Sequence, residues 1–228
     1  MPPLASRPFR DRRHAGKLLG QRLRVYADRS DVLVLALPRG GVPVAYEVAT
    51  ELHAPLDVFL VRKLGVPGFE ELAMGAIASG GLRVVNEDLV RSLNLTDNAI
   101  DQVAARELLE LNRRERLYRD DRPEPDPAGH IVILVDDGLA TGSTMRAAAQ
   151  ALARKRPARI VVAVPIAASE TCEALSREVD EVICAVTPEP FHAVGLWYND
   201  FDQTSDAEVR ALLTQNRRDQ DARIGRLK

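Results

Sequence analysis

The stretch that decides the fold reads VILVDDGLATGSTM and runs from Val132 to Met145. Four apolar residues lead directly into Asp136 and Asp137, and a turn of small and hydroxyl-bearing residues follows. An apolar run of this kind is typical of a strand in a parallel sheet that is covered on both faces. Because ligands of open α/β sheets bind beyond the carboxyl ends of the strands, the two carboxylates stand where a binding site is expected.

The rest of the chain alternates between strand-like and helix-like segments. This alternation predicts an α/β fold in which a parallel sheet is flanked by helices. The length of 228 residues suits a single domain over 1–228. The polar last twelve residues are expected to fray. Strands are expected near 31–37, 57–63, 131–135, 158–166 and 180–186, helices near 9–26, from 42 onward, 96–119, 143–155 and 168–177, and a hairpin over 73–86 turning at Gly80 and Gly81.

Composition narrows the classes of function. Hydrophobic residues make up 46% of the chain and charged residues 28%, with a formal net charge of -2, which argues against a general binder of nucleic acid or membrane surfaces. Arginines gather at 7–13, 112–122 and 217–226, but acidic residues lie among them, which favours solvated helix faces. We therefore expect neither nucleic acid nor a membrane as a partner.

The cellular compartment is predicted from the same kind of evidence. The first residues lack the apolar core of a secretory signal, and the longest apolar runs are too short to span a bilayer. Two cysteines, Cys172 and Cys184, make neither a disulfide framework nor a zinc site, which favours a reducing compartment. These features predict a cytoplasmic protein.

The turn after the two aspartates has the composition of a phosphate site. It leads into a predicted helix, whose first amides have no partner within the helix. Gly142 permits close approach of a ligand, and Thr141, Ser143 and Thr144 offer hydroxyl donors. The neighbouring carboxylates suit sugar hydroxyls, or a magnesium ion that bridges the two. A ribose 5-phosphate matches both halves, and an ordinary Asx-type turn with a helix cap is the alternative.

The same stretch resembles the binding signature of the type I phosphoribosyltransferases: an apolar strand, two acidic residues and a T-G-x-T loop. The resemblance implies that family's fold, with a small hood subdomain, and its substrates 5-phosphoribosyl-1-pyrophosphate (PRPP), with Mg²⁺, and a nitrogenous base. The implied reaction moves the ribose 5-phosphate group to the base and releases pyrophosphate. The implied PRPP contacts here are Asp136, Asp137, Gly138, Leu139, Ala140, Thr141, Gly142, Ser143 and Thr144, with Mg²⁺ held by the aspartates indirectly, through ribose hydroxyls or water.

The stretch LPRGGVP, residues 37–43, matches the position of the family's pyrophosphate loop. The resemblance implies that Arg39, Gly40 and Gly41 bind the diphosphate and that a cis peptide bond precedes Arg39. Taken alone, the stretch is also compatible with an ordinary turn between a strand and a helix.

The segment 61–78 occupies the position of the family's mobile lid, where Arg62 and Lys63 would reach the pyrophosphate. A solvated hairpin loop with surface cations is the alternative. The resemblance assigns catalytic roles to four residues, namely Asp136, Asp137, Arg39 and Lys63.

The aromatic tail matches the place of the hood, whose C-terminal part is expected at 186–215. Trp197, Tyr198 or Phe201 could stack on a base, and the alternative is that they close a satellite core.

The segment 86–128 is expected to be a helical insertion. Position 140 is alanine, where the 6-oxopurine branch carries an aspartate, so the PRPP motif is closer to the adenine branch. The remainder resembles a bacterial group of phosphoribosyltransferases without an assigned base.

Two other classes of protein compete with the enzyme. A non-enzymatic PRPP-sensing regulator would use the same fold and would need a nucleic-acid surface. A phosphoacceptor receiver domain would need a lone aspartate acceptor and a strand-end lysine, and Pro165 ends the next strand instead. The acceptor base stays open, and the family resemblance allows a homodimer.

Overall fold

A five-stranded parallel sheet, in the order β2-β1-β6-β7-β8, forms the centre of the protein. The computed structural model describes residues 8–119 and 122–226. Strands β1 and β6 are buried along their whole length, which confirms the predicted parallel sheet covered on both faces. The strands are β1 (Val32–Ala36), β2 (Leu56–Val58), β6 (Ile131–Val135), β7 (Arg159–Ile166) and β8 (Glu181–Val186).

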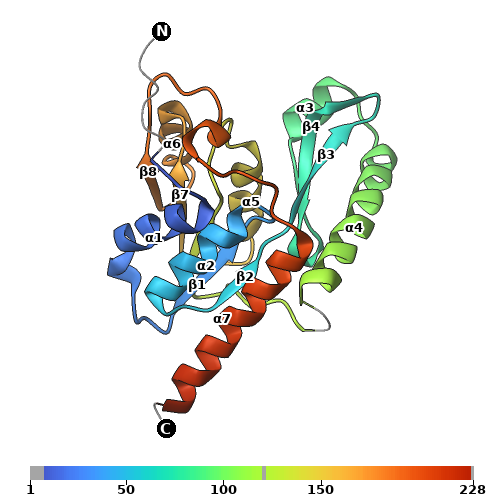
Figure 1. Ribbon diagram of the computed structural model, residues 1–228. Helices are drawn as coiled ribbons and strands as arrows, with labels where there is room; N and C mark the ends of the chain where they lie inside the picture. The colour runs from blue at the N-terminus through green and yellow to red at the C-terminus, as the bar shows by residue number, and fades with distance from the viewer. Residues whose placement is uncertain (1–7, 120–121, 227–228) are drawn as a thin grey trace.

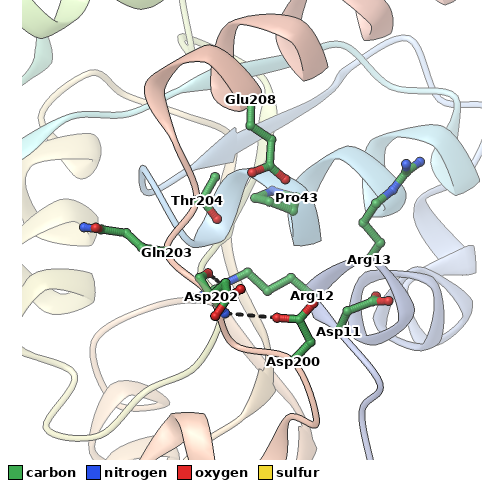
Figure 2. A pocket seen from close by; sticks show the side chains of 9 residues that line it. All are labelled: Asp11, Arg12, Arg13, Pro43, Asp200, Asp202, Gln203, Thr204 and Glu208. Carbon is green, nitrogen blue, oxygen red and sulfur yellow. Dashed lines mark hydrogen bonds between the residues drawn. The ribbon is translucent and has the colours of Figure 1, made fainter.

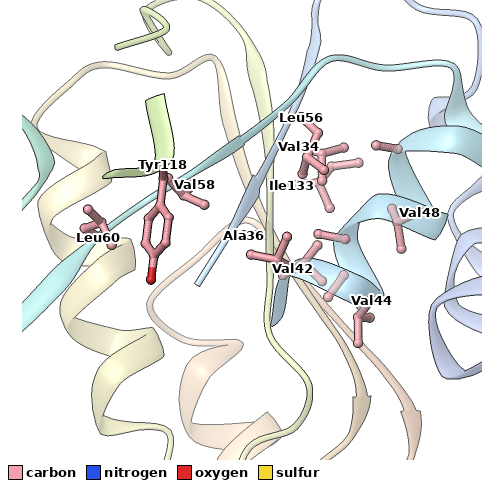
Figure 3. Close-up of a cluster of buried hydrophobic side chains, with 14 of the residues drawn as sticks. Val34, Ala36, Val42, Val44, Val48, Leu56, Val58, Leu60, Tyr118 and Ile133 are labelled. Atoms are coloured by element: carbon pink, nitrogen blue, oxygen red, sulfur yellow. The ribbon is translucent and has the colours of Figure 1, made fainter. Parts of the chain in front are cut away.

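Helices cover both faces of this sheet (Figure 1). Residues that alternate along each strand face opposite layers, so Val34 and Ile133 pack with α2, whereas Leu35 and Leu134 pack with α5. Figure 3 shows the first of these layers. The helices are α1 (Arg12–Arg22), α2 (Gly41–Leu52) and α7 (Asp206–Arg226) on one side, α5 (Ser143–Ala153) and α6 (Ser169–Leu175) on the other, and the short turns η1 (Arg24–Tyr26) and η3 (Val194–Trp197).

A second, antiparallel sheet stands beside the first (Figure 1). The expected strand over 57–63 is divided in two, because the chain leaves the parallel sheet after Phe59. The amide of Phe59 donates to Ala36 O at 2.9 Å, and that of Leu60 donates to the Ser79 hydroxyl at 2.9 Å. This sheet contains β3 (Val61–Val66), β4 (Phe69–Ala78) and β5 (Leu82–Val85), linked by η2 (Ser79–Gly81).

The lid segment 61–78 is therefore a β-hairpin, and the predicted hairpin that turns at Gly80 and Gly81 is confirmed. The segment proposed as an insertion begins after β5 and contains α3 (Glu87–Ser92) and α4 (Asp97–Arg119). The Thr96 hydroxyl accepts the Ala99 amide at 3.3 Å, as expected of a helix cap.

The prediction that the last twelve residues fray is wrong, because α7 continues to Arg226. Long-range hydrogen bonds dock this helix on the β2 side of the sheet. The Asn216 carboxamide accepts the Leu56 amide at 3.0 Å, the Gln220 carboxamide donates to Ala54 O at 3.0 Å, and Arg223 Nη1 donates to His53 O at 3.1 Å. Residues 227 and 228 lie outside the described part.

The two cysteines also differ from expectation, because Cys172 in α6 and Cys184 in β8 form a disulfide. Helix α6 packs on β8 and brings the two Cα atoms to 6.8 Å. The packing of α6 on β8 could not be foreseen from a cysteine count. Across the described ranges, the structure contains no helix that is both long and apolar enough to cross a membrane.

Candidate active site

The site lies where the neighbouring strands β1 and β6 end. The Leu37 amide donates to Val135 O at 2.9 Å, so the turn after β1 and the loop after β6 run side by side. A Cβ atom on Gly40 would overlap the Asp137 carboxylate and would lie 2.7 Å from its Cγ. A side chain at position 40 would therefore displace the Asp137 carboxylate.

Residues of the turn after β1 are engaged in contacts within the chain. The bond between Pro38 and Arg39 is cis, as the resemblance predicted. The Gly41 amide donates to Leu37 O at 3.1 Å, which counts against its predicted contact with pyrophosphate. Arg39 Nη1 lies 3.9 Å from Asp206 Oδ1. That carboxylate also accepts the Tyr118 hydroxyl at 2.6 Å.

Asp136 and Asp137 form an adjacent acidic pair at the end of β6. The Asp137 amide donates to Asp136 Oδ1 at 2.8 Å. Burial raises the pKa of Asp136 well above its usual range, and the adjacent charge of Asp137 raises it further. The carbonyl of Asp137 accepts the Tyr198 hydroxyl at 2.6 Å, which ties this strand end to the tail.

The loop from 138 to 144 is anchored by hydrogen bonds to neighbouring segments, and several of its residues are exposed. The Leu139 amide donates to Ile166 O at 2.9 Å, and the Thr171 hydroxyl donates to Ala140 O at 2.6 Å. Gly142, with a φ of 69°, turns the chain into α5, whose start has no side-chain cap among the described residues. The hydroxyl-bearing residues Thr141, Ser143 and Thr144 are exposed, and the Thr141 hydroxyl donates to the Ser143 hydroxyl at 3.3 Å. This arrangement suits a phosphate.

The two predicted lid cations have different surroundings. Exposed Lys63 lines a cavity of about 100 Å³ together with Ser143 and Thr144 of the loop. Arg62 lines a neighbouring space with Pro38 and Thr144, but its Nη2 donates to Glu107 of α4 at 2.6 Å. Thr144 thus lines both spaces.

The predicted base-stacking residues lie in a small satellite core. Tyr198 is 1% exposed and packs between Phe9 and Phe201, with ring centroids 5.2 Å and 4.9 Å away. This packing leaves no open ring face and counts against Tyr198 as a stacking residue. Trp197 and Phe201 are partly buried against the same cluster.

Arg12 is a site residue that the sequence does not predict, and its Nε donates to Asp137 Oδ2 at 2.8 Å. The local pattern predicts a solvated face for the arginines of 7–13, but the Arg12 side chain is only 11% exposed. Arg119, in a second such segment, is also buried and pairs with Asp57 at 3.0 Å. Both partners lie far away in the sequence, so no local pattern could have identified these pairs.

The described residues contain no group of three or more His, Cys, Asp or Glu side chains arranged to hold a metal ion. The acidic pair fits a metal only if the ligand supplies most of the coordinating oxygens. Mg²⁺ is commonly bound in this way, through one or two carboxylates and substrate phosphates.

Comparison with known proteins agrees with this geometry. The pattern of the phosphoribosyl transferase domain matches residues 11–196. The Mycobacterium tuberculosis protein named "Putative phosphoribosyl transferase Rv0571c" is 48% identical over 211 residues, which make up 92% of this chain and 47% of that protein. The chain therefore spans about half the length of this relative.

Two further comparisons cover different shares of the chain. The Bifunctional protein PyrR of Chloroflexus aurantiacus is 37% identical over 131 residues, covering 56% of this chain and 66% of that protein. The crystal structure of TT1426 from Thermus thermophilus superposes with a TM-score of 0.81 at 44% identity, covering 91% of this chain and 98% of that one. The strand-end acids, the loop that follows them and the matched domain pattern lead to one conclusion: the chain belongs to the phosphoribosyl transferase family.

Proposed function

We propose that the protein transfers the ribose 5-phosphate group of PRPP to a nitrogenous base and releases pyrophosphate. One observation carries this proposal. The loop at 138–142 connects the Asp136–Asp137 pair to the uncapped start of α5, so groups suited to a diol and groups suited to a phosphate lie on one short segment. A ligand with a phosphate at one end and a diol beside it fits this arrangement.

The acidic pair would act on the ribose. Asp136 and Asp137 would accept hydrogen bonds from its 2- and 3-hydroxyls and stabilise the positive charge that develops on the sugar. The loop at 138–144 would hold the 5-phosphate, and binding energy from that remote group orients the reacting carbon.

The departing pyrophosphate would be stabilised by Arg39 and Lys63. Preorganised groups of this kind contribute about 3 kcal/mol each in other enzymes. Mg²⁺, when bound, would neutralise charge on the pyrophosphate. The ligand and the acidic pair would hold the ion. Arg62 would join these cations only if its ion pair with Glu107 were broken. The Gly40 amide remains the proposed backbone contact of the turn after β1 with the pyrophosphate.

The acceptor base is proposed only as a class. Ala140 offers no carboxylate to receive a proton from a 6-oxopurine. Trp197 and Phe201 remain proposed stacking residues, since Tyr198 is buried. The homodimer and the cytoplasmic location likewise remain predictions from the resemblance and the sequence.

The proposal is tested by incubating the protein with PRPP, Mg²⁺ and a panel of purine and pyrimidine bases. We expect pyrophosphate release that depends on one base, with the matching nucleoside monophosphate detected by mass spectrometry. Asp137→Asn is the inactive control. If no base supports release and PRPP does not bind, the proposal is wrong.

A regulatory role is the second candidate. It is favoured by the similarity to a relative named as bifunctional. A protein of this kind would bind PRPP without transferring it to any base. Binding of PRPP without turnover, together with salt-dependent binding of nucleic acid, would favour this candidate over the enzyme.

A further inference from the structure

Arg12, in the first turn of α1, contacts two distant parts of the chain. Its Nε donates to Asp137 Oδ2 at 2.8 Å, and its Nη1 donates to the carbonyl oxygen of Asp202 at 2.7 Å. The guanidinium carbon lies 3.9 Å from the centre of the Phe201 ring. Figure 2 shows the side chain reaching from α1 to Asp202, along one wall of a cavity of about 210 Å³. One guanidinium therefore joins the strand-end acid to the tail.

The surrounding chain aims Arg12 in this direction. The segment before α1 pairs with the tail, because the Asn199 amide donates to Phe9 O at 2.9 Å and the Asp200 amide donates to Arg10 O at 2.9 Å. Asp11 caps the helix by accepting the His14 amide at 2.7 Å. These contacts fix both the position and the direction of the first turn of α1.

The turn after β1 closes around the same ion pair. A Cβ atom on Gly40 would overlap the Asp137 carboxylate and would lie 3.3 Å from Arg12 Nε. The Arg12 and Asp137 side chains are only 11% and 17% exposed, so water screens their interaction weakly. Rotation of the Asp137 carboxylate is therefore restricted on two sides.

We propose that Arg12 is a positioning residue for the ribose of PRPP. It holds one oxygen of Asp137, so that the other oxygen is presented to the ribose hydroxyls, and it makes that orientation depend on the tail at Phe201 and Asp202. This inference rests on the proposed function, because it assigns the ribose to the acidic pair.

Arg13 provides a matched control. It follows Arg12 in the same helical turn, but its Nε donates to Glu47 Oε1 at 2.5 Å on α2. Its side chain is 55% exposed. Removing its charge changes the local charge as much as removing that of Arg12, but leaves Asp137 untouched.

The test compares two ligands by calorimetric titration in the presence of Mg²⁺. PRPP contains the ribose, whereas inorganic pyrophosphate does not. For Arg12→Gln we expect PRPP affinity to fall about 10- to 100-fold, the range for a hydrogen bond to a charged group, with pyrophosphate affinity nearly unchanged. Arg12→Lys, which keeps the charge but loses the two-pronged geometry, should lie in between. Arg13→Gln should behave as wild type.

Thermal unfolding of each variant separates positioning from general damage. If Arg12→Gln does not fold, the same ligand-selective loss in Arg12→Lys supports the inference. Equal losses for both ligands, or unchanged PRPP affinity, would overturn it. A wild-type protein that does not bind PRPP would instead refute the proposed function, so the two failures are distinguishable.

Discussion

The turn after β1 and the loop after β6 lie side by side, but internal contacts engage their polar groups to different degrees. In the turn, the Gly41 amide is engaged with Leu37 and the Arg39 guanidinium faces Asp206. In the loop, the start of α5 has no side-chain cap among the described residues, and Thr141, Ser143 and Thr144 are exposed. The loop is therefore open to a ligand, whereas a ligand at the turn must compete with an internal partner.

The largest effect is expected at the acidic pair that separates the two regions. Asp137→Asn keeps the size of the side chain but removes the charge that would stabilise the ribose. We expect a loss of turnover of about 10²- to 10³-fold or more, with the fold retained. Steady-state assays and circular dichroism check this, with Asp88→Asn on exposed α3 as control. Near wild-type rates would refute the role assigned to Asp137.

The next largest effect concerns the close approach of the two strand ends. Gly40→Ala introduces a Cβ atom that overlaps the Asp137 carboxylate. Displacement of this kind commonly costs about 1–3 kcal/mol, so PRPP affinity should fall roughly tenfold or more. Gly225→Ala is the control, because nothing lies within 4 Å of its added Cβ. Equal PRPP affinity in the two variants would mean that the turn does not constrain Asp137.

A smaller effect, on stability, is expected at Asp136. Its pKa is raised by folding, so protonated Asp136 stabilises the folded state at low pH. That stabilisation is lost as the pH rises above the unfolded-state pKa and through the folded one. Asp136→Asn should therefore raise the Tm at neutral pH, by about 2–4 °C for each kcal/mol, while PRPP binding falls.

This prediction is checked by thermal unfolding over a range of pH. The gain in Tm from the Asp136→Asn substitution should shrink as the pH falls and the wild-type carboxyl becomes protonated. A lower Tm than wild type at neutral pH would show that the acidic pair does not destabilise the empty site.

The smallest effect tests whether Asp206 competes for Arg39. Asp206→Asn removes the charge that faces Arg39, and partly exposed ion pairs contribute about 0.2–1 kcal/mol. PRPP should therefore bind up to about fivefold more tightly. Asp221→Asn on the same helix is the control for a change in net charge. Weaker binding in Asp206→Asn would show that Asp206 positions Arg39 instead of competing for it.

The two strand ends also show which features could be predicted from the sequence. Strands β1 and β6, the acidic pair and the helix that follows depend on neighbouring residues, and local pattern predicted them. The cis bond before Arg39 followed from the family resemblance, because the family's pyrophosphate loop often carries one. The expected single strand at 57–63 divided because the Phe59 amide still donates to Ala36 of the parallel sheet, whereas the next amide, that of Leu60, donates to Ser79.

Contacts between distant segments could not be predicted in this way. The Arg12–Asp137 pair joins residues 125 positions apart, and Asn216 bonds Leu56 over 160 positions. Tyr198 shows the same limit, since an aromatic tail residue has the same local pattern whether it stacks on a base or fills a core. The packing of Phe9 and Phe201 around its ring favours the core.

The central claim is that the acidic pair and the loop after β6 form a PRPP site. The most direct test is calorimetric titration with PRPP, with and without Mg²⁺, of the wild type and of the double variant Asp136→Asn/Asp137→Asn. We predict magnesium-dependent binding in the wild type and none in the double variant. Absence of binding in the wild type under both conditions, or equal binding in the double variant, would contradict the claim.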